Sequence, residues 1–563
     1  MTTIENRRFA LLVAGGVILF LLYQAWQKDF APHSAPPSAS APQPDVDPGD
    51  DLPAASSAPA AAPASASAQP AATAAATASP AGMRIHVRTD VLDVELSTEG
   101  GDVRRVELLG YPVAKKHPDQ NVALLDDQAD RWFVIQSGLT GADGPIVSHR
   151  DLYRAAAERY ALADGVDQIV VPLEFSDAHG RTVTKTYTFR RGSYVVELKQ
   201  RLGNAGAAAL AVNPYVQLWR TEFKVGEEPP FIPSWMGLGL YEQKAAGDSY
   251  RFRKVAFKDL PEEKVESKQT GDWIAMLQHY FVAAVIPPAD QGATLIGKPS
   301  TTRGFLAQYI GAAQEVPAQG QRDFAAQLYI GPKLQQKLGS VAPGLELTVN
   351  YGLLTPIAEP LFWLLDWFHK LTRNWGAAII LLTLSVKLAL YKLSEAQYRS
   401  MAKMKKYAPR IQELKERYGD DRERMHKAMM ELYKKEKFNP LAGCWPLLVQ
   451  FPVFIALYWV LLESVELRQA DFALWLNDLS SPDPYYVMPV LFGISMFVQQ
   501  KLSGNVAMDP MQQRVMNMMP VMLTVFFAFF PVGLVLYWFV SNLIGIAQQW
   551  WITRKLTREG LRH

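Results

Sequence analysis

An apolar stretch in the middle of the chain, residues 374–394, carries one lysine in its interior and restricts the possible folds. The stretch is long enough for a helix to cross the apolar layer of a membrane, which is about 30 Å thick. At about 1.5 Å per residue, Lys387 lies roughly 18 Å from Trp375 along that helix. A charge at this depth costs at least about 2.5 kcal/mol and normally faces protein or water. Lys387 is therefore either a functional charge or a lysine whose stem extends to the nearer interface, as expected for Lys392.

Composition excludes several kinds of site. The net charge of +2 and the hydrophobic fraction of 49% average over a polar first half and a very apolar second half. Cys444 is the only cysteine, so no disulfide within the chain and no pair of cysteine ligands can form. None of the nine histidines falls in a predicted membrane segment. We therefore expect no metal, no cofactor and no catalytic residues.

The N-terminal region predicts a membrane anchor followed by a tether. Arg7 and Arg8 precede an apolar run over residues 9–26, which is either a cleaved signal peptide or, as we prefer, an uncleaved anchor with residues 1–8 in the cytoplasm. Residues 31–82 are almost entirely Ala, Pro and Ser. Such a segment cannot bury a core, so we expect a disordered tether.

Residues 83–347 predict one large all-β, sandwich-like domain outside the cytoplasm. Apolar and polar residues alternate along them, as in half-buried antiparallel strands, with turns expected at Gly100-Gly101, His179-Gly180 and Arg191-Gly192. The apolar run over residues 273–287 is too short for a span, so we interpret it as a core strand and His279 as a core histidine.

Residues 353–373 change to helical periodicity. Trp363 and Trp367 stand among apolar residues at helical spacing. We favour an amphipathic helix lying in the membrane interface, and a helix that closes the β domain is the alternative.

Residues 395–438 predict a cytoplasmic helical hairpin. They contain 13 Lys and Arg against 8 Asp and Glu, and the positive-inside rule places such segments in the cytoplasm. Gly419 separates two amphipathic stripes that include four methionines. Those methionines either pack the two helices together or offer an adaptable apolar surface to a client or to the ribosome. They are Met401, Met404, Met425 and Met429.

Four more apolar runs complete a polytopic bundle of six spans with both termini in the cytoplasm. After the second span at 375–394, the predicted segments are a third span at 441–462, a periplasmic loop at 463–484, a fourth span at 485–500, a cytoplasmic loop at 501–514, a fifth span at 515–530, a sixth span at 532–552 and a cytoplasmic tail at 553–563. The fourth and fifth spans are short, at about 24 Å of helix, and short spans thin the bilayer around them. No carboxylate falls mid-membrane to neutralise Lys387.

Three motifs give the second half a specific resemblance. The stretches SMAKMKKYAPRIQELKERYGDD, DPMQQRVMNMMP and GLVLYWFVSNL, within residues 374–551, are similar to those of the YidC membrane insertases of Gram-negative bacteria. The first span, the tether and the β domain occur in the same order as in that family. The resemblance implies a conserved five-span core with a hydrophilic groove, and a periplasmic domain that resembles a sugar-processing fold without established sugar chemistry.

The resemblance also assigns groove positions, with two departures. It places Lys387, Thr383, Gln450 and Trp538 in or near the groove, where most relatives have arginine at position 387 and often tyrosine at position 538. Tyr391-Lys392 replaces the usual Tyr-Pro, which predicts that the second span continues without a break. The implied partners are nascent inner-membrane proteins, the Sec translocon, the lipid bilayer and, as a further candidate, translating ribosomes, with no specific nucleic acid.

The resemblance implies a non-enzymatic membrane protein insertase and chaperone. It would give polar client segments a partial crossing and release the client's apolar span into lipid. A small-solute transporter or channel is the alternative, although we see no internal repeat and no intramembrane acid. An intramembrane serine protease is a weaker alternative, because Ser495 and Ser541 have no histidine or second membrane lysine placed as a base.

Overall fold

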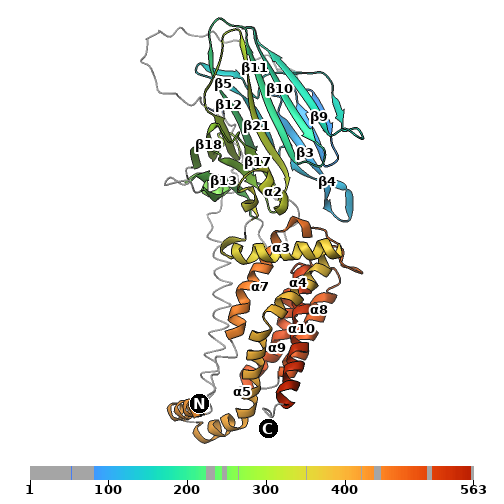
Figure 1. Ribbon diagram of the computed structural model, residues 1–563, viewed down its shortest axis with the longest axis vertical. Helices are drawn as coiled ribbons and strands as arrows, with labels where there is room; N and C mark the ends of the chain where they lie inside the picture. Colours follow the sequence, from blue (N-terminus) through green and yellow to red (C-terminus); the bar gives the residue numbers. More distant parts are fainter. Residues whose placement is uncertain are drawn as a thin grey trace, which may run out of the picture. The chain divides into compact units, whose positions relative to one another are not determined.

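The computed structural model describes residues 52–53, 82–223, 235–243, 250–263, 265–349, 351–419, 421–435, 445–503 and 510–558. The predicted first span and almost all of the tether lie outside these residues. The described residues divide into two compact units, a β domain of residues 82–349 together with residues 463–466, and a helical unit of residues 351–462 and 467–558. Both are drawn in Figure 1, and each is described below by itself.

The first sheet of the β domain has twelve described strands. In spatial order they are β15 (Val265–Thr270), β18 (Gly292–Pro299), β19 (Phe305–Gly311), β12 (Leu210–Arg220), β5 (Phe133–Gly141), β3 (Val103–Ala114), β2 (Leu92–Ser97), β1 (Arg84–Arg88) and β8 (Arg159–Ala161), with β20 (Gln314–Val316), β4 (His117–Leu125) and β6 (Gly144–Val147) on side branches. All strand pairs in this sheet are antiparallel except β1 and β8, which makes the sheet mixed.

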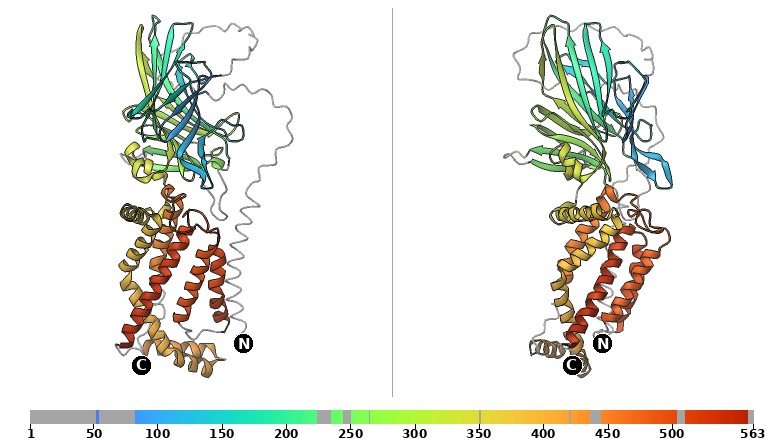
Figure 2. Two further views of the ribbon diagram at one scale, coloured as in Figure 1. Left: turned by 90° about the vertical axis from the view of Figure 1, so that its right-hand side faces the viewer. Right: turned by 45° about the vertical axis from the view of Figure 1, so that its right-hand side comes forward.

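The second sheet has nine described strands and packs face to face on the first, as the two layers in Figure 2 show. In order they are β14 (Tyr250–Ala256), β13 (Gly237–Gln243), β16 (Trp273–Leu277), β17 (Phe281–Ile286), β21 (Gly320–Pro332), β11 (Val195–Asn204), β10 (Arg181–Arg190), β9 (Gln168–Ser176) and β7 (Arg154–Ala155). Short helices follow or interrupt the strands: η2 (Phe257–Asp259), α2 (Gln335–Val341) and η3 (Leu345–Thr348).

The predicted strands of this domain are confirmed where turn glycines bound them. Strands β2 and β3 flank Gly100 and Gly101, which adopt φ values of 71° and 59°. A Cβ at Gly100 would lie 2.5 Å from the carbonyl oxygen of His149, so the turn requires glycine. Strands β9, β10 and β11 follow one another with the two predicted turns between them.

The prediction that residues 273–287 are core strand rather than a span is confirmed, but two details are wrong. The run forms two paired core strands, β16 and β17, rather than one. His279 lies in the turn between them and is only partly buried, with its ring 4.2 Å from that of Tyr280. The turn lets both strands stay in the sheet, which leaves the histidine at the strand ends rather than in the core.

The helical unit begins with the short η4 and the amphipathic α3. Its helices are η4 (Gly352–Leu354), α3 (Thr355–Thr372), α4 (Trp375–Ala389), α5 (Tyr391–Tyr418), α6 (Arg422–Lys435), α7 (Trp445–Glu463), η6 (Val465–Leu467), α8 (Val487–Ser503), α9 (Pro510–Phe527) and α10 (Val532–Arg558). The predicted hairpin is present as α5 and α6. Asp421 ends the turn between them, since its carboxylate accepts a hydrogen bond from the Arg424 backbone N–H at 3.1 Å.

Length and composition identify few complete spans among the described residues. One helix, Val532–Leu556 within α10, is long and apolar enough to cross a membrane alone. The bent pair Trp375–Ala389 and Tyr391–Ser400 passes the same test only together, and Gln450–Glu463 and Val487–Leu502 are shorter apolar helices. The six-span topology therefore stays a prediction.

Candidate functional site

Contacts at the start of α4 fix the position of the helix that carries Lys387. The side-chain oxygen of Asn374 accepts a hydrogen bond from the Ala377 backbone N–H at 2.9 Å and caps the helix. The ring of Trp375 stacks on that of His369 in α3, with centroids 3.9 Å apart. Lys387 follows about three turns further along α4.

Thr383 and Lys387 share one face of α4 because they are one turn apart. Thr383 is fully buried, and its hydroxyl donates to the Ile379 carbonyl at 2.6 Å. Lys387 is partly exposed, and helical geometry directs its side chain back toward the start of α4. No carboxylate of the described residues interacts electrostatically with its ammonium group. The charge thus lies on a mainly apolar helix without an ionic partner from that part of the chain.

The second span breaks directly after Lys387, so the expected continuous helix is wrong. At Leu390 the backbone leaves helical geometry (φ −90°, ψ 10°), and α5 continues at 63° to α4. The side-chain amide of Gln548 on α10 donates to the Lys387 carbonyl at 3.3 Å, in the last turn of α4. Carbonyls at a helix end need such partners. Gln548 therefore stabilises the break, and no local sequence signal marks it.

Trp538 lies in an aromatic cluster. Its ring centroid is 4.6 Å from that of Phe454 on α7 and 5.7 Å from that of Phe527 on α9. Its indole N–H is buried without a hydrogen-bond acceptor among the described residues. Gln450 precedes Phe454 by one turn and is partly buried. The structure thus brings Trp538 and Gln450 to the same side of α7.

The predicted groove residues form two pairs. Gln450 and Trp538 are linked through Phe454, whereas Thr383 and Lys387 are linked by α4. Along α10, Trp538 lies about 15 Å from Gln548, the residue that contacts the Lys387 backbone. Lys387 is therefore about three helical turns from the aromatic cluster.

Sequence reasoning missed several polar contacts among α5, α8 and α10. The Tyr398 hydroxyl donates to the Gly545 carbonyl at 3.2 Å, and the Asn542 amide donates to the Ser495 hydroxyl at 3.3 Å. Ser495 in turn donates to the Phe492 carbonyl at 2.7 Å. This bonded serine, with no histidine beside it among the described residues of α8 and α10, has a structural role. Among these contacts, only Gly545 gave a signal in the sequence, because a glycine, which has no Cβ, lets other groups approach its backbone closely.

The methionines of the hairpin are only partly described. Met425 and Met429 on α6 are partly exposed, so their side chains can contribute to an adaptable apolar surface. Met401 and Met404 belong to α5, but their side chains lie outside the described residues.

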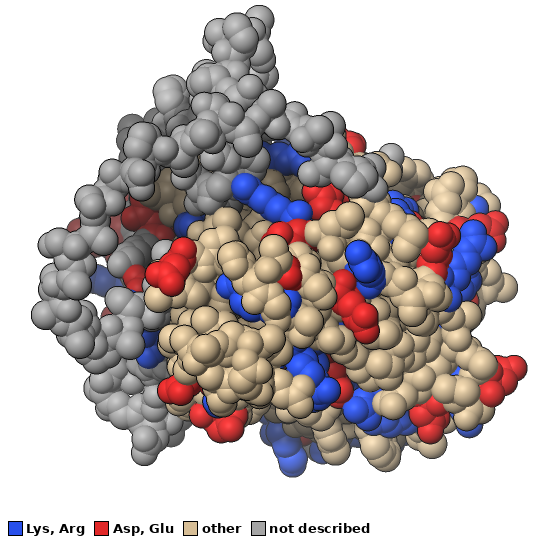
Figure 3. Space-filling model, turned by 90° about the horizontal axis from the view of Figure 1, so that it is seen from above, with Lys and Arg blue, Asp and Glu red and all other residues tan. Residues whose placement is uncertain are grey.

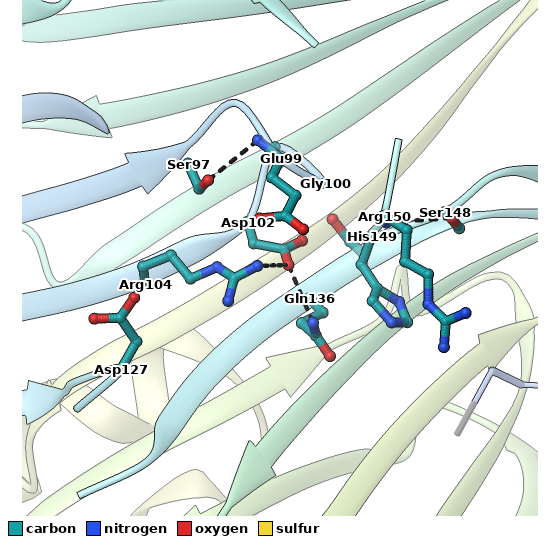
Figure 4. A network of polar contacts seen from close by, with 12 residues as sticks. Ser97, Glu99, Gly100, Asp102, Arg104, Asp127, Gln136, Ser148, His149 and Arg150 are labelled. Carbon is teal, nitrogen blue, oxygen red and sulfur yellow. Dashed lines mark hydrogen bonds and ion pairs between the residues drawn. The ribbon is translucent and has the colours of Figure 1, made fainter. Parts of the chain in front are cut away.

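A buried polar row crosses the first sheet of the β domain, and it was not predicted. The Gln308 amide donates to Gln217 at 2.9 Å, Gln217 donates to Gln136 at 2.8 Å, and Gln136 donates to the Asp102 carboxylate at 3.2 Å. Figure 4 shows the Asp102 end of this row, where Arg104 also donates to the carboxylate, at 3.3 Å. Asp102 and the three glutamines are at most 3% exposed.

Lys185 enters the same interior from the second sheet. Its ammonium donates to the carbonyls of Gly100 and Ser137 at 2.5 and 3.0 Å and lies 4.9 Å from the ring centroid of Tyr153. Burial raises the pKa of Asp102 to about 6 and lowers the pKa of Lys185 to about 8. Because these groups are fully buried, the network holds the sheets together and offers no reacting group to a substrate.

No other arrangement in the described residues suggests chemistry. They contain no group of three or more His, Cys, Asp or Glu side chains that could hold a metal ion. On the face of the β domain in Figure 3, basic and acidic side chains are interspersed. The described residues visible on that face therefore form no large area of one charge sign.

Comparison with known proteins assigns each unit to a known protein family. The family described as "YidC periplasmic domain" matches residues 84–364, and the family described as "60Kd inner membrane protein" matches residues 367–559. Proteins named membrane protein insertase YidC match over the whole length. That of Methylococcus capsulatus is 46% identical over 99% of this chain and 100% of its own, and that of Nitrosococcus oceani is 45% identical with the same coverage.

Among solved structures, the crystal structure of an active YidC insertase with its first transmembrane domain resolved covers 83% of this chain and 94% of its own. Its identity is 18% and its TM-score 0.37. The chain belongs to the YidC family of membrane protein insertases, in the Gram-negative type that carries a periplasmic domain.

Proposed function

We propose that this protein is a membrane protein insertase of the inner membrane, with its β domain in the periplasm. The observation that carries the proposal is Lys387, a cation on a mainly apolar helix with no carboxylate from the described residues acting on it. The full-length relatives with this arrangement of domains are named as insertases. Its clients are nascent membrane proteins, and the process makes and breaks no covalent bond.

Lys387 acts as a fixed positive charge in a hydrophilic groove. In the groove, contact with this charge partly compensates a polar or acidic client segment for the water that it loses. This contact lowers the free-energy cost of the crossing. Gln450 and Trp538 lie further along the groove, and Thr383, which is buried on the same face of α4 as Lys387, supports the groove wall. The client's apolar span then leaves sideways, because its transfer into lipid is favourable.

Six spans with both termini in the cytoplasm remain the topology that we propose. The helices α8 and α9 have 17 and 18 residues, or about 26 Å each, so they cross only a thinned bilayer. In α3, the exposed Trp363, Trp367 and Leu371 follow one another at one-turn intervals, which supports the interfacial helix. The hairpin of α5 and α6 faces the cytoplasm and offers Met425 and Met429 to clients or ribosomes. Cooperation with the Sec translocon belongs to the same proposal.

Insertion into liposomes that contain only this protein tests the function. We expect a small single-span client to insert more efficiently than into empty liposomes. The Lys387→Ala variant should lower insertion of clients with acidic translocated segments about tenfold, as loss of one charge interaction predicts, and that of neutral clients much less. Lys387→Arg should retain activity.

Lys392→Ala is the matched control, because Lys392 is exposed and lies five residues further along the chain. Equal loss for acidic and neutral clients would remove the charge from the mechanism. Solute flux through the purified protein without client insertion would instead favour a transporter.

A further inference from the structure

The loop that joins η6 to α8, residues 468–486, is built around two aspartates. The Asp478 carboxylate accepts hydrogen bonds from the Gln469 backbone N–H at 3.0 Å and from the hydroxyls of Ser480 and Ser481 at 2.6 and 2.7 Å. Asp483 accepts one from the Met488 backbone N–H at 2.7 Å, which caps the start of α8. The loop therefore has a defined shape.

The same loop is fastened to the starts of α4 and α10. The Asn374 amide donates to the Phe472 carbonyl at 2.9 Å, and the Gly533 N–H donates to the Leu479 carbonyl at 2.9 Å. A Cβ at Gly376 would lie 2.0 Å from the Phe472 ring, so the ring packs directly on the α4 backbone. The loop thus lies level with the start of α4, directly after the end of α3.

The tip of the loop presents a leucine in an unfavourable conformation. Leu474 has a φ of 56°, in the left-handed region, and its side chain is 85% exposed. A bridge between Ala473 and Leu476 holds this turn. Glycine or asparagine would be the usual residue at such a position. A leucine held there and directed outward indicates that its side chain has a partner outside the protein.

Aromatic side chains gather beside this leucine. The Trp475 indole N–H and the Tyr485 backbone N–H both donate to one oxygen of Asp483, at 3.1 and 3.0 Å. Tyr485 and Tyr486 are exposed, and Tyr486 also has a φ of 56°. We name Leu474, Trp475, Tyr485 and Tyr486 the tip patch. Tryptophan and tyrosine, with an apolar ring and a polar end, are the residues that favour membrane interfaces.

The tip patch continues into an exposed apolar stripe along α8, and this stripe identifies what covers the patch. Directly after Tyr486, the exposed apolar residues Val490 and Ile494 continue at one-turn intervals along α8. An exposed apolar stripe on a membrane helix faces acyl chains. Its aromatic end therefore lies where acyl chains meet head groups, at the level of the exposed α3 residues. We propose that the tip patch is a lipid-binding element that anchors the periplasmic end of α8 in the outer head-group boundary.

The proposal has a consequence for bilayer thickness. At the other end of α8, the Lys501 ammonium lies 5.3 Å from the ring centroid of Phe497. A lysine at the end of a membrane helix marks an interface, which is here the one opposite the tip patch. Tyr486 and Lys501 are separated by about 22 Å of helix, less than the usual 30 Å of apolar core. The patch and Lys501 together thus hold the bilayer thin at α8. This inference rests on the membrane location in the proposed function but not on the insertion mechanism.

Thiol labelling tests the anchor. In a Cys444→Ser background, Leu474→Cys and Asn477→Cys place one thiol each in the loop, and Asn477 is exposed without being part of the patch. In vesicles of phosphatidylethanolamine and phosphatidylglycerol, a membrane-impermeant maleimide should modify the thiol of the Leu474→Cys variant about tenfold more slowly than that of the Asn477→Cys variant, as burial of one leucine-sized group predicts. Equal rates would overturn the proposal. Neither result depends on whether clients insert.

The Leu474→Gly variant separates anchoring from packing. Glycine adopts the positive φ freely, so the unfolding midpoint in detergent should stay unchanged or rise. In vesicles, a fluorophore at position 485 should lose about half of its quenching by lipids brominated near the head group, since the leucine anchor is gone. A lower unfolding midpoint with unchanged quenching would show that Leu474 packs within the loop, which contradicts the proposal.

Discussion

Each unit of this protein places a lysine on an apolar surface, and the two lysines differ in their surroundings. Lys185 of the β domain is fully buried and donates to two backbone carbonyls beside Asp102 and the Tyr153 ring. Lys387 of the helical unit is partly exposed, and no carboxylate of the described residues acts on it. The fold holds the first ammonium group, whereas the second has no such partner among the described residues and, in the function that we propose, meets water or a client.

The difference shows how burial relates to function in this chain. A buried cation that has acceptors stabilises the arrangement around it, since its removal strands those acceptors. A cation without acceptors costs free energy in the resting protein and is retained where a ligand uses it. The same side-chain substitution should therefore have opposite effects on stability in the two units.

Lys185→Met should have the largest effect. It leaves the carbonyls of Gly100 and Ser137 without their donor and leaves Asp102 with Arg104 as its only nearby positive charge among the described residues, which should destabilise the β domain by about 3–5 kcal/mol. Thermal or denaturant unfolding of the full-length protein in detergent measures the change. Lys199→Met is the control, because Lys199 is half exposed and pairs with Asp323 on the domain surface, where an ion pair contributes less than about 1 kcal/mol. Similar losses for both variants would contradict the role of Lys185.

Lys387→Met should act in the opposite direction. It removes a charge from an apolar helix and keeps the length of the side chain, so the helical unit should gain up to about 2.5 kcal/mol while insertion of acidic clients falls. Unfolding in detergent, monitored by a signal from the helical unit, measures the gain. Lys392→Met, at an exposed position, should change little. A clear destabilisation by Lys387→Met would mean that the lysine holds the fold, and the contrast with Lys185 would disappear.

Local patterns predicted the elements around both lysines. Alternation of apolar and polar residues predicted the strand β10, whose inner face carries the buried Val183, Lys185, Tyr187 and Phe189. Glycines marked the turn between β2 and β3, and Gly419 marked the end of α5. These signals lie within a few residues of the features that they predict, so a single sequence is sufficient to find them.

Contacts between distant segments could not be predicted in this way. The break at Leu390 is accompanied by a hydrogen bond from Gln548, which is 161 residues from its acceptor Lys387. The polar row in the β domain joins Asp102, Gln136, Gln217 and Gln308 from four separate segments, none of which has a distinctive local pattern. Strand register alone aligns the glutamines, because Gln217 is paired with Gln136 on one side and Gln308 on the other. For Lys185, alternation predicted the strand but neither the burial of the side chain nor the carbonyls that accept its hydrogen bonds.

The smallest predicted effect concerns the carboxylate that faces Lys185. Burial raises the pKa of Asp102 to about 6 from an ordinary 3.8, so the folded state binds more protons than the unfolded chain between these pH values. Stability should therefore fall as the pH rises from about 4 to 6, by on the order of 2 kcal/mol from this group, and Asp102→Asn should lack this component.

Asp323→Asn is the control with the opposite sign: hydrogen bonds from Arg201 and Lys199 lower the pKa of Asp323 to about 2, so its contribution is lost only below pH 4. Unfolding midpoints of the three proteins at pH 3 to 7 measure the difference, and parallel profiles for wild type and Asp102→Asn would show that Asp102 stays ionised throughout. In that case Lys185 would face a permanent negative charge, and its contrast with Lys387 would be larger than the structure indicates.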